Sequence, residues 1–172
     1  MKNAKFGIKI EFDTENNFNK NGLDKIEFVI STNIGEEAKS LIKIASGGEM
    51  SRIMLAIKNV LADVDKIPVI IFDEIDTGIS GIAANVTGEK MKQISRKHQV
   101  ICVTHLASIA AKGDYNYFVC KEIENEKTKT KVKQLSEDEI LSEIARISTG
   151  TITEISLKHA KELRYMNMKE IA

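Results

Sequence analysis

The stretch Val69-Ile70-Ile71-Phe72-Asp73-Glu74 decides the fold of this chain, because four consecutive apolar residues run directly into two carboxylates. An unbroken apolar run of this length predicts a strand buried on both faces, which is typical of a parallel sheet. Ligands of open α/β sheets gather at the carboxyl ends of such strands. The stretch therefore predicts an α/β fold whose site begins at Asp73 and Glu74.

A second apolar run, residues 99–104, ends at His105 and predicts a neighbouring parallel strand. A helix is expected between the two runs, from about Ile82 to Lys97, and a short helix after the second, over residues 106–111. The side of the first helix that is expected to be apolar carries Ile82, Val86, Met91 and Ile94. Strand, helix, strand and helix in this order predict a parallel sheet with right-handed crossovers. Such strands end at one edge, so we expect His105 to lie beside the two carboxylates.

The quartet Ser46-Gly47-Gly48-Glu49 opens a long helical pattern. Apolar residues then recur at spacings of three and four, at Met50, Ile53, Met54, Ile57, Val60, Leu61 and Val64. Ser46 with Glu49 fits a capping box. Glycines allow close approach of a ligand, and the free N–H groups of a first helical turn favour anions. The quartet is therefore either a phosphate site or a simple glycine-rich turn capped by serine.

Antiparallel strands are expected on both sides of the parallel sheet. Alternating residues predict strands at 5–12 and 25–31, joined by a turn or loop between Glu15 and Gly22. Residues 36–44 fit a loop or a short strand. Two further strands are expected at 115–123 and 129–135, the latter with one wet face. Ser136 with Glu139 predicts a helix that stops at Gly150, and a last helix covers about 153–168.

Composition describes an ordinary globular chain. The 172 residues are expected to form a single domain, with 42% hydrophobic and 29% charged residues. The formal net charge of zero gives no support for non-specific DNA binding. No apolar run approaches the roughly 20 residues of a membrane span, and the N-terminus lacks a signal-peptide pattern. Cys102 and Cys120 lack metal-ligand spacing, so we expect two buried free thiols and a cytoplasmic location.

The polar residues at the strand ends suit phosphate chemistry. Of the two carboxylates, which the pleat should direct to opposite sides, one can hold Mg²⁺ and the other can orient or deprotonate an attacking water. His105 can hydrogen-bond a terminal phosphate or that water. The alternatives are two solvated acids at a loop start and a strand-end histidine capped by backbone. His98 and His159 lack this context and are expected to be surface or structural residues.

The order of these pieces resembles the C-terminal half of an ABC-type ATPase head. Three stretches carry the resemblance: residues 44–58 around Ser46-Gly47-Gly48-Glu49, Ile71-Phe72-Asp73-Glu74-Ile75-Asp76-Thr77-Gly78-Ile79-Ser80-Gly81, and Val103-Thr104-His105-Leu106. They are similar to the RecN family of bacterial DNA repair proteins, which are relatives of the SMC proteins. The resemblance covers nearly the whole chain. It implies the C-terminal half of a P-loop NTPase head, with a mostly parallel central sheet.

The resemblance also implies roles for individual residues. Ser46, Gly47 and Gly48, with Glu49 beside them, would form the signature motif that contacts the γ-phosphate of ATP bound by the opposite head. Asp73 would be the Walker B aspartate that serves Mg²⁺, Glu74 the catalytic carboxylate and His105 the switch histidine. Residues 78–81 would form the D-loop at the dimer interface.

Two positions depart from the pattern of these relatives. Ala45 stands where many ABC proteins have leucine. Ala107-Ser108 follows His105-Leu106 where Pro-Gln is expected, so the resemblance implies no contacts for the loop after the histidine.

The Gly-x-x-x-x-Gly-Lys-Ser/Thr loop of a complete site is absent from the 172 residues. Because that loop supplies most phosphate contacts, we expect this chain to bind nucleotide poorly alone and to act as one piece of a split head. Its expected partners are the N-terminal head segment of the parent protein, a second head in a homodimer, and DNA through the full-length protein. The family's coiled coil would enter just before residue 1. Apolar surface should be exposed where the missing half packs.

Two other functions stay open. One is a fragment of an ABC transporter ATPase, although Glu49 stands where transporters are expected to carry glutamine. The other is a non-catalytic docking module, against which the intact Glu74 and His105 argue.

Overall fold

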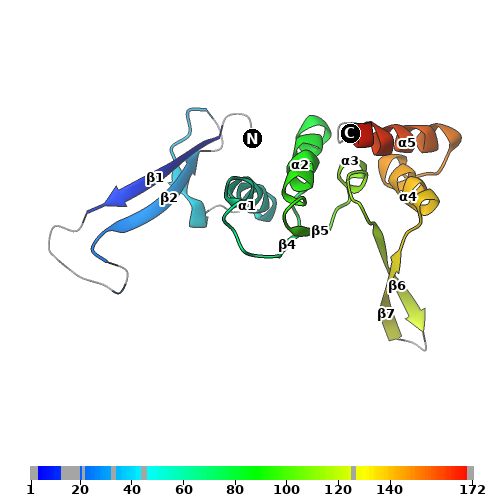
Figure 1. Cartoon of the computed structure of the whole chain (residues 1–172), viewed down its shortest axis with the longest axis horizontal. Coiled ribbons are helices and arrows are strands. Elements are labelled where there is room, and N and C mark those ends of the chain that lie inside the picture. Colours follow the sequence, from blue (N-terminus) through cyan, green and yellow to red (C-terminus); the bar gives the residue numbers. More distant parts are fainter. Residues whose placement is uncertain are drawn as a thin grey trace. The chain divides into compact units, whose positions relative to one another are not determined.

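The computed structural model describes residues 4–12, 20, 22–31, 34–43, 46–124 and 127–169, with side chains up to Tyr165 in the last helix. Its contacts divide into two compact units, Met1–Ser46 and Gly47–Ala172 (Figure 1). Ala45 and most of the expected turn between the first two strands, residues 15–19 and 21, lie outside the described residues.

The first unit is a three-stranded antiparallel sheet of β1 (Lys5–Glu11), β2 (Lys25–Ser31) and β3 (Lys39–Ser40), followed by the 3₁₀ turn η1 (Leu41–Lys43). The two predicted strands are confirmed, and residues 36–44 contain the short strand. Ile8 pairs with Phe28, and alternation places every apolar side chain of β1 and β2 except Val29 on one face. The rings of Phe6 and Phe28 stack there with centroids 5.5 Å apart. Most of this face is about half exposed among the described residues.

The second unit follows the expected order of elements. They are α1 (Gly47–Leu61), β4 (Val69–Phe72), α2 (Gly81–Ile94), β5 (Gln99–Cys102), α3 (Ala107–Ala110), β6 (Tyr117–Glu124), β7 (Lys127–Gln134), α4 (Glu137–Thr149) and α5 (Glu154–Lys169). β4 and β5 pair in parallel, with Ile71 opposite Ile101. The predicted combination of parallel strands, helices and antiparallel strands is confirmed.

Only one face of the β4–β5 pair is covered by the described residues. Ile70 and Phe72 pack into a core with side chains of α1, α2 and α3. The other face presents the exposed side chains Val69, Ile71, Ile101 and Val103. The prediction that β4 is buried on both faces is therefore wrong for this chain, because no layer of described residues covers the second face. Ile71 is 68% exposed although its neighbour Phe72 is buried.

The helices also differ from the predicted apolar faces. Ile82 and Val86 of α2 are exposed, whereas the small residues Ala84, Thr87 and Gly88 are buried with Met91 and Ile94. A Cβ at Gly88 would lie 2.7 Å from the Cδ of Lys112, so the glycine makes room for that long side chain. In α1, Ile53 and Leu55 are buried, but Val60 and Val64 are exposed, and Val64 lies beyond the end of the helix.

The C-terminal helices pack on each other around Ile140, Leu141, Ile144 and Ala160. The predicted capping box is present, because the N–H of Ser136 donates to Glu139 Oε2 at 3.0 Å. Gly150 ends α4 with φ 78°, as expected for a left-handed cap.

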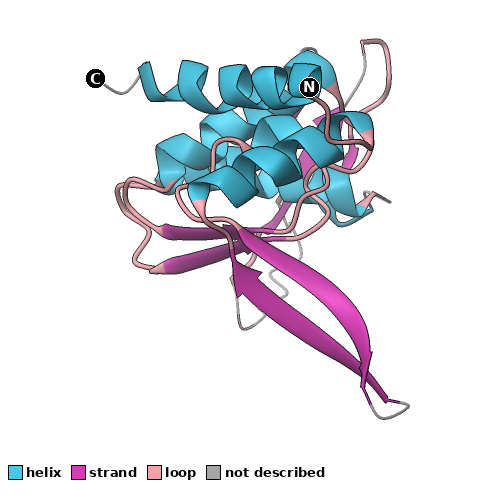
Figure 2. Cartoon of the chain, turned by 90° about the vertical axis from the view of Figure 1, so that its right-hand side faces the viewer, coloured by secondary structure: helices cyan, strands magenta, loops and turns pink. Residues whose placement is uncertain are grey.

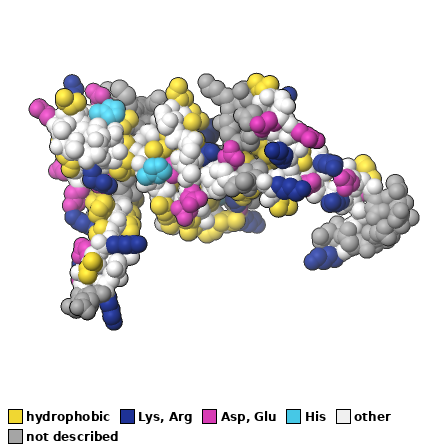
Figure 3. All heavy atoms as spheres, turned by 180° about the vertical axis from the view of Figure 1, so that it is seen from behind, with side chains coloured by type: hydrophobic (Ala, Val, Ile, Leu, Met, Phe, Trp, Pro, Cys, Tyr) yellow, Lys and Arg dark blue, Asp and Glu magenta, His cyan; other side chains and the backbone are white. Residues whose placement is uncertain are grey.

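The β6–β7 hairpin projects away from the helices (Figure 2). Every residue of β7 is exposed, so the expectation of one wet and one covered face is wrong within the described residues. Apolar and basic side chains lie side by side along the hairpin (Figure 3). Cys102 and Cys120 are free and only partly buried. The described helices include none that is long and apolar enough to cross a membrane.

Candidate functional site

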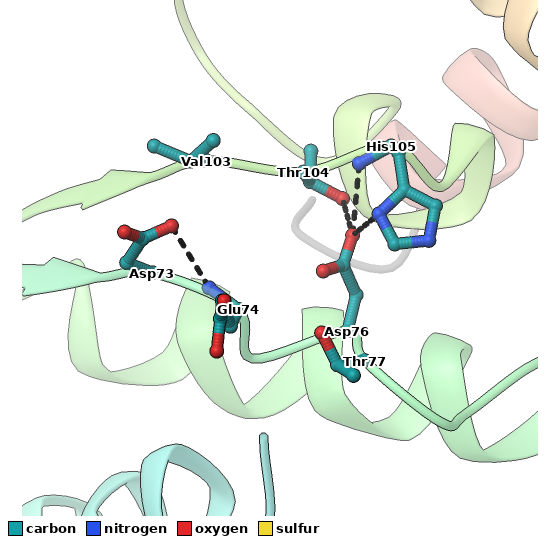
Figure 4. A pocket seen from close by; sticks show the side chains of 7 residues that line it. All are labelled: Asp73, Glu74, Asp76, Thr77, Val103, Thr104 and His105. Carbon is teal, nitrogen blue, oxygen red and sulfur yellow. Dashed lines mark hydrogen bonds and ion pairs between the residues drawn. The ribbon is translucent and has the colours of Figure 1, made fainter. Parts of the chain in front are cut away.

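A pocket opens where β4 and β5 end. Its lining residues are Asp73, Glu74, Asp76, Thr77, Val103, Thr104 and His105 (Figure 4). The parallel pairing of β4 with β5 puts both strand ends at the same edge, as the sequence predicts. The three residues expected from the strand ends, Asp73, Glu74 and His105, therefore line one pocket.

Glu74 has an unusual backbone. The strand ends at Phe72, and the carboxylate of Asp73 accepts the N–H of Glu74 at 3.0 Å. Glu74 then adopts φ 56°, in the left-handed region that few non-glycine residues enter. The carboxylates of Asp73 and Glu74 point apart (Figure 4), through this turn rather than through the pleat of a strand. Strained backbone of this kind is common at functional sites.

The glycines of the quartet allow α1 to approach this turn closely. A Cβ at Gly47 would lie 2.7 Å from Glu74 Oε2, and a Cβ at Gly48 would lie 2.8 Å from the Thr77 carbonyl oxygen. The Glu74 carboxylate thus lies beside the first turn of α1, whose N–H groups favour negative charge. Glu49 is partly buried in that turn, and Ser46 is a partly buried residue at the end of the preceding unit.

Two further residues of α1, neither of them expected from the sequence to belong to the site, hold the loop after β4. Ser51 Oγ donates to the Asp73 carbonyl oxygen at 3.0 Å. Arg52 Nη1 donates to the carbonyl oxygens of Ile75, at 3.1 Å, and Thr77, at 2.8 Å. Burial lowers the pKa of the Arg52 guanidinium, which nevertheless stays charged at neutral pH.

Asp76 is an acidic pocket residue that was not expected to belong to the site. Its side chain is 2% exposed, and Oδ2 accepts from Thr104 Oγ1 at 2.6 Å and from the N–H of His105 at 2.8 Å. Nδ1 of the His105 ring lies 3.1 Å from the same oxygen. The only signal in the sequence is a third acidic residue two positions after Glu74, and nothing there marks it as buried.

The charge of the pocket suits a cation. Burial, and then the negative charges of Asp76 and Asp73, raise the pKa of the neighbouring Cys102 thiol to about 12. Among the described residues no three His, Cys, Asp or Glu side chains gather into a metal site. Mg²⁺ at phosphate sites takes one or two carboxylates and completes its shell with phosphate and water. The exposed carboxylate of Asp73 fits such a ligand.

The other histidines match their expected structural or surface roles. His98 is buried, with Nδ1 2.6 Å from the Ile67 carbonyl oxygen, and His159 is exposed.

The fold is that of an SMC-type head. A solved structure described as the Smc head domain with a coiled coil and joint derived from Pyrococcus yayanosii is similar over 84% of this chain and 26% of that chain. The TM-score is 0.57 at 19% sequence identity, so this likeness establishes the fold.

Proteins that are similar in sequence identify the family, which the likeness of fold alone does not. Proteins named DNA repair protein RecN are 47% identical over 83% of this chain in Bacillus subtilis, 48% identical over 83% in Treponema pallidum and 46% identical over 96% in Rickettsia prowazekii. The chain is therefore a homologue of one segment of the RecN proteins, and it spans 25–30% of the length of these three. No protein-family model matches it.

Proposed function

We propose that this chain is the part of a RecN-like ATPase head that supplies the signature motif, the Walker B carboxylates and the switch histidine. In this proposal it serves ATP binding and hydrolysis at a head–head interface during DNA double-strand break repair and recombination. The observation that carries the proposal is the meeting of Asp73, Glu74 and His105 at one pocket. Homology to RecN proteins supports the assignment to DNA repair.

Phosphoryl transfer requires positioning and neutralisation of charge more than covalent chemistry by the protein. Mg²⁺, when bound, would neutralise phosphate charge, and Asp73 would supply one of its oxygen ligands. Glu74 would orient the attacking water and accept its proton. His105 would contact the terminal phosphate. Ser46, Gly47, Gly48 and Glu49 would act on ATP held by the opposite head.

The site needs a second segment of the head to bind ATP. The sequence contains no Walker A loop, and the relatives are more than three times longer than this chain. The exposed apolar face of the β4–β5 pair is suited to packing against such a segment. In this proposal the 172 residues form one part of a split head, and the longer protein contacts DNA in the cytoplasm.

The test is Glu74→Gln in a head completed with the N-terminal segment of a RecN relative. The change should abolish ATP hydrolysis and leave ATP-dependent dimerisation intact, because only the proton acceptor is lost. Glu162→Gln, at an exposed position on α5, is the matched control and should hydrolyse ATP normally. An assembled head with no nucleotide response would overturn the ATPase proposal and favour a docking module.

A further inference from the structure

We infer that Asp76 is a positioning residue for His105, which fixes the tautomer and orientation of the imidazole so that Nε2 is the nitrogen left to meet a phosphate oxygen or water. The role of Nε2 toward phosphate rests on the proposed function. The contact between Asp76 and His105 is a property of this chain and can be tested without nucleotide.

A single oxygen of Asp76 collects the donors of the β5 end. Oδ2 accepts from the Thr104 hydroxyl and the His105 N–H, and Nδ1 of the ring is within hydrogen-bond distance. The Thr104 hydroxyl itself accepts the N–H of Leu106 at 3.1 Å, which leaves its own proton for Asp76. Charge-assisted bonds of this kind are the stronger ones. The side chain of Asp76 is therefore fixed before it meets the ring.

This arrangement decides which ring nitrogen carries the proton. A neutral imidazole has one N–H, and a carboxylate beside Nδ1 places it there. Nε2 then has a free lone pair, and it becomes a donor only in the imidazolium, whose charge Asp76 balances. The side chain of His105 is 71% exposed, so a ligand can reach it. Neutral His105 would accept a hydrogen bond from water, whereas contact with a phosphate oxygen would require the charged ring.

A purely structural role for Asp76 makes a different prediction. If the carboxylate only caps the backbone of His105 and the hydroxyl of Thr104, the ring tautomer should not depend on it. Asp76→Ala separates the two cases. Because the single oxygen Oδ2 faces all three donors, an amide oxygen in its place would still accept from Nδ1, whereas alanine removes the acceptor beside the ring. The neutral ring is then free to take the Nε2-protonated form that an unconstrained histidine favours.

The experiment is a long-range ¹H–¹⁵N spectrum of the ¹⁵N-labelled chain, at a pH where the histidines are neutral. Wild-type His105 should be protonated at Nδ1, and Asp76→Ala should move the proton to Nε2. Exposed His159 is the internal reference, and Asp114→Ala, at an exposed loop position, is the control variant. Wild-type His105 protonated at Nε2, or an unchanged tautomer in a folded Asp76→Ala chain, would overturn the inference. The wild-type spectrum decides the first point even if the variant fails to fold.

Turnover in the completed head provides the second arm. Asp76→Ala should lower kcat by about 10–100-fold, with little change in KM for ATP, as is typical when a partner that orients a histidine is lost. A switched tautomer with wild-type kcat would refute the positioning role. A wild-type head that hydrolyses no ATP would refute the proposed function and leave the tautomer result standing.

Discussion

Arg52 Nη1 lies 2.8 Å from the carbonyl oxygen of Thr77, so one guanidinium group on α1 holds the backbone of the loop that carries Glu74 and Asp76. The same nitrogen donates to the carbonyl of Ile75, and Ser51 binds that of Asp73. The helix that begins in the glycine quartet is thus tied through hydrogen bonds to the loop after β4. A displacement of either one would strain the other.

Replacement of Arg52 should therefore destabilise the chain. Arg52→Met removes both hydrogen bonds and leaves two carbonyl oxygens without their donor, which costs about 1–3 kcal/mol in the free energy of unfolding. Arg96→Met, at an exposed position after α2, should change it by less than about 0.5 kcal/mol. Urea denaturation of the three chains measures the difference. Equal midpoints for the two variants would show that the Arg52 contacts contribute nothing to stability.

The two glycines of the quartet should respond differently to alanine. At Gly48 the new Cβ would meet backbone, the carbonyl oxygens of Thr77 and Glu74 at 2.8 and 3.0 Å, and the loop must shift. We expect Gly48→Ala to lower the free energy of unfolding by about 1–3 kcal/mol, as at other overpacked sites. At Gly47 the Cβ would meet only the end of the Glu74 side chain, which can rotate away.

Thermal unfolding of Gly47→Ala and Gly48→Ala tests this contrast. Gly113→Ala is the control, because its Cβ would have neighbours no closer than 3.4 Å. If Gly47→Ala proves the more destabilising variant, the close approach of α1 to the Thr77 backbone is wrong.

The order of elements was predictable because it depends on local pattern. Two apolar runs that end in polar residues predicted β4 and β5, and parallel pairing then required Asp73 and His105 to lie at one edge. Ser136 and Glu139 predicted the start of α4 through a contact between residues three positions apart.

The features that the sequence did not reveal depend on residues distant along the chain. Ile70 and Ile71 are identical in kind, and only the packing of helices on one side makes Ile70 buried. Asp76 accepts from Thr104, 28 positions later, and Arg52 reaches Thr77 across 25. Neither contact follows from the spacing of residue types within one element.

A substitution on the exposed face of the β4–β5 pair should weaken binding of the N-terminal head segment without lowering the stability of the isolated chain. Ile71→Lys adds a charge at a side chain that is already exposed, so the free energy of unfolding of the isolated chain should change by less than about 0.5 kcal/mol. If the N-terminal head segment covers this face, the buried ammonium should weaken its binding at least about tenfold.

Titration calorimetry with that segment measures the effect. Ile155→Lys, a matched change at an exposed position of α5, should bind as the wild type does. Equal affinities for the two variants would place the contact with the segment elsewhere on the chain.

Glu139 should make α4 and its junction with the hairpin sensitive to acid. The hydrogen bond from Lys133, followed by that from the Ser136 N–H, lowers the pKa of Glu139 from its ordinary value of 4.5 to about 2. Because the folded value is the lower one, the stabilisation is fully present above pH 4.5 and is lost as the pH falls toward 2. Glu139→Gln should thus lower Tm at pH 5, and the difference in Tm between the variant and the wild type should disappear as the pH falls to 2. Thermal unfolding across this range, with Glu162→Gln as the control, tests the prediction, and a gap independent of pH would show that the ionised carboxylate contributes nothing.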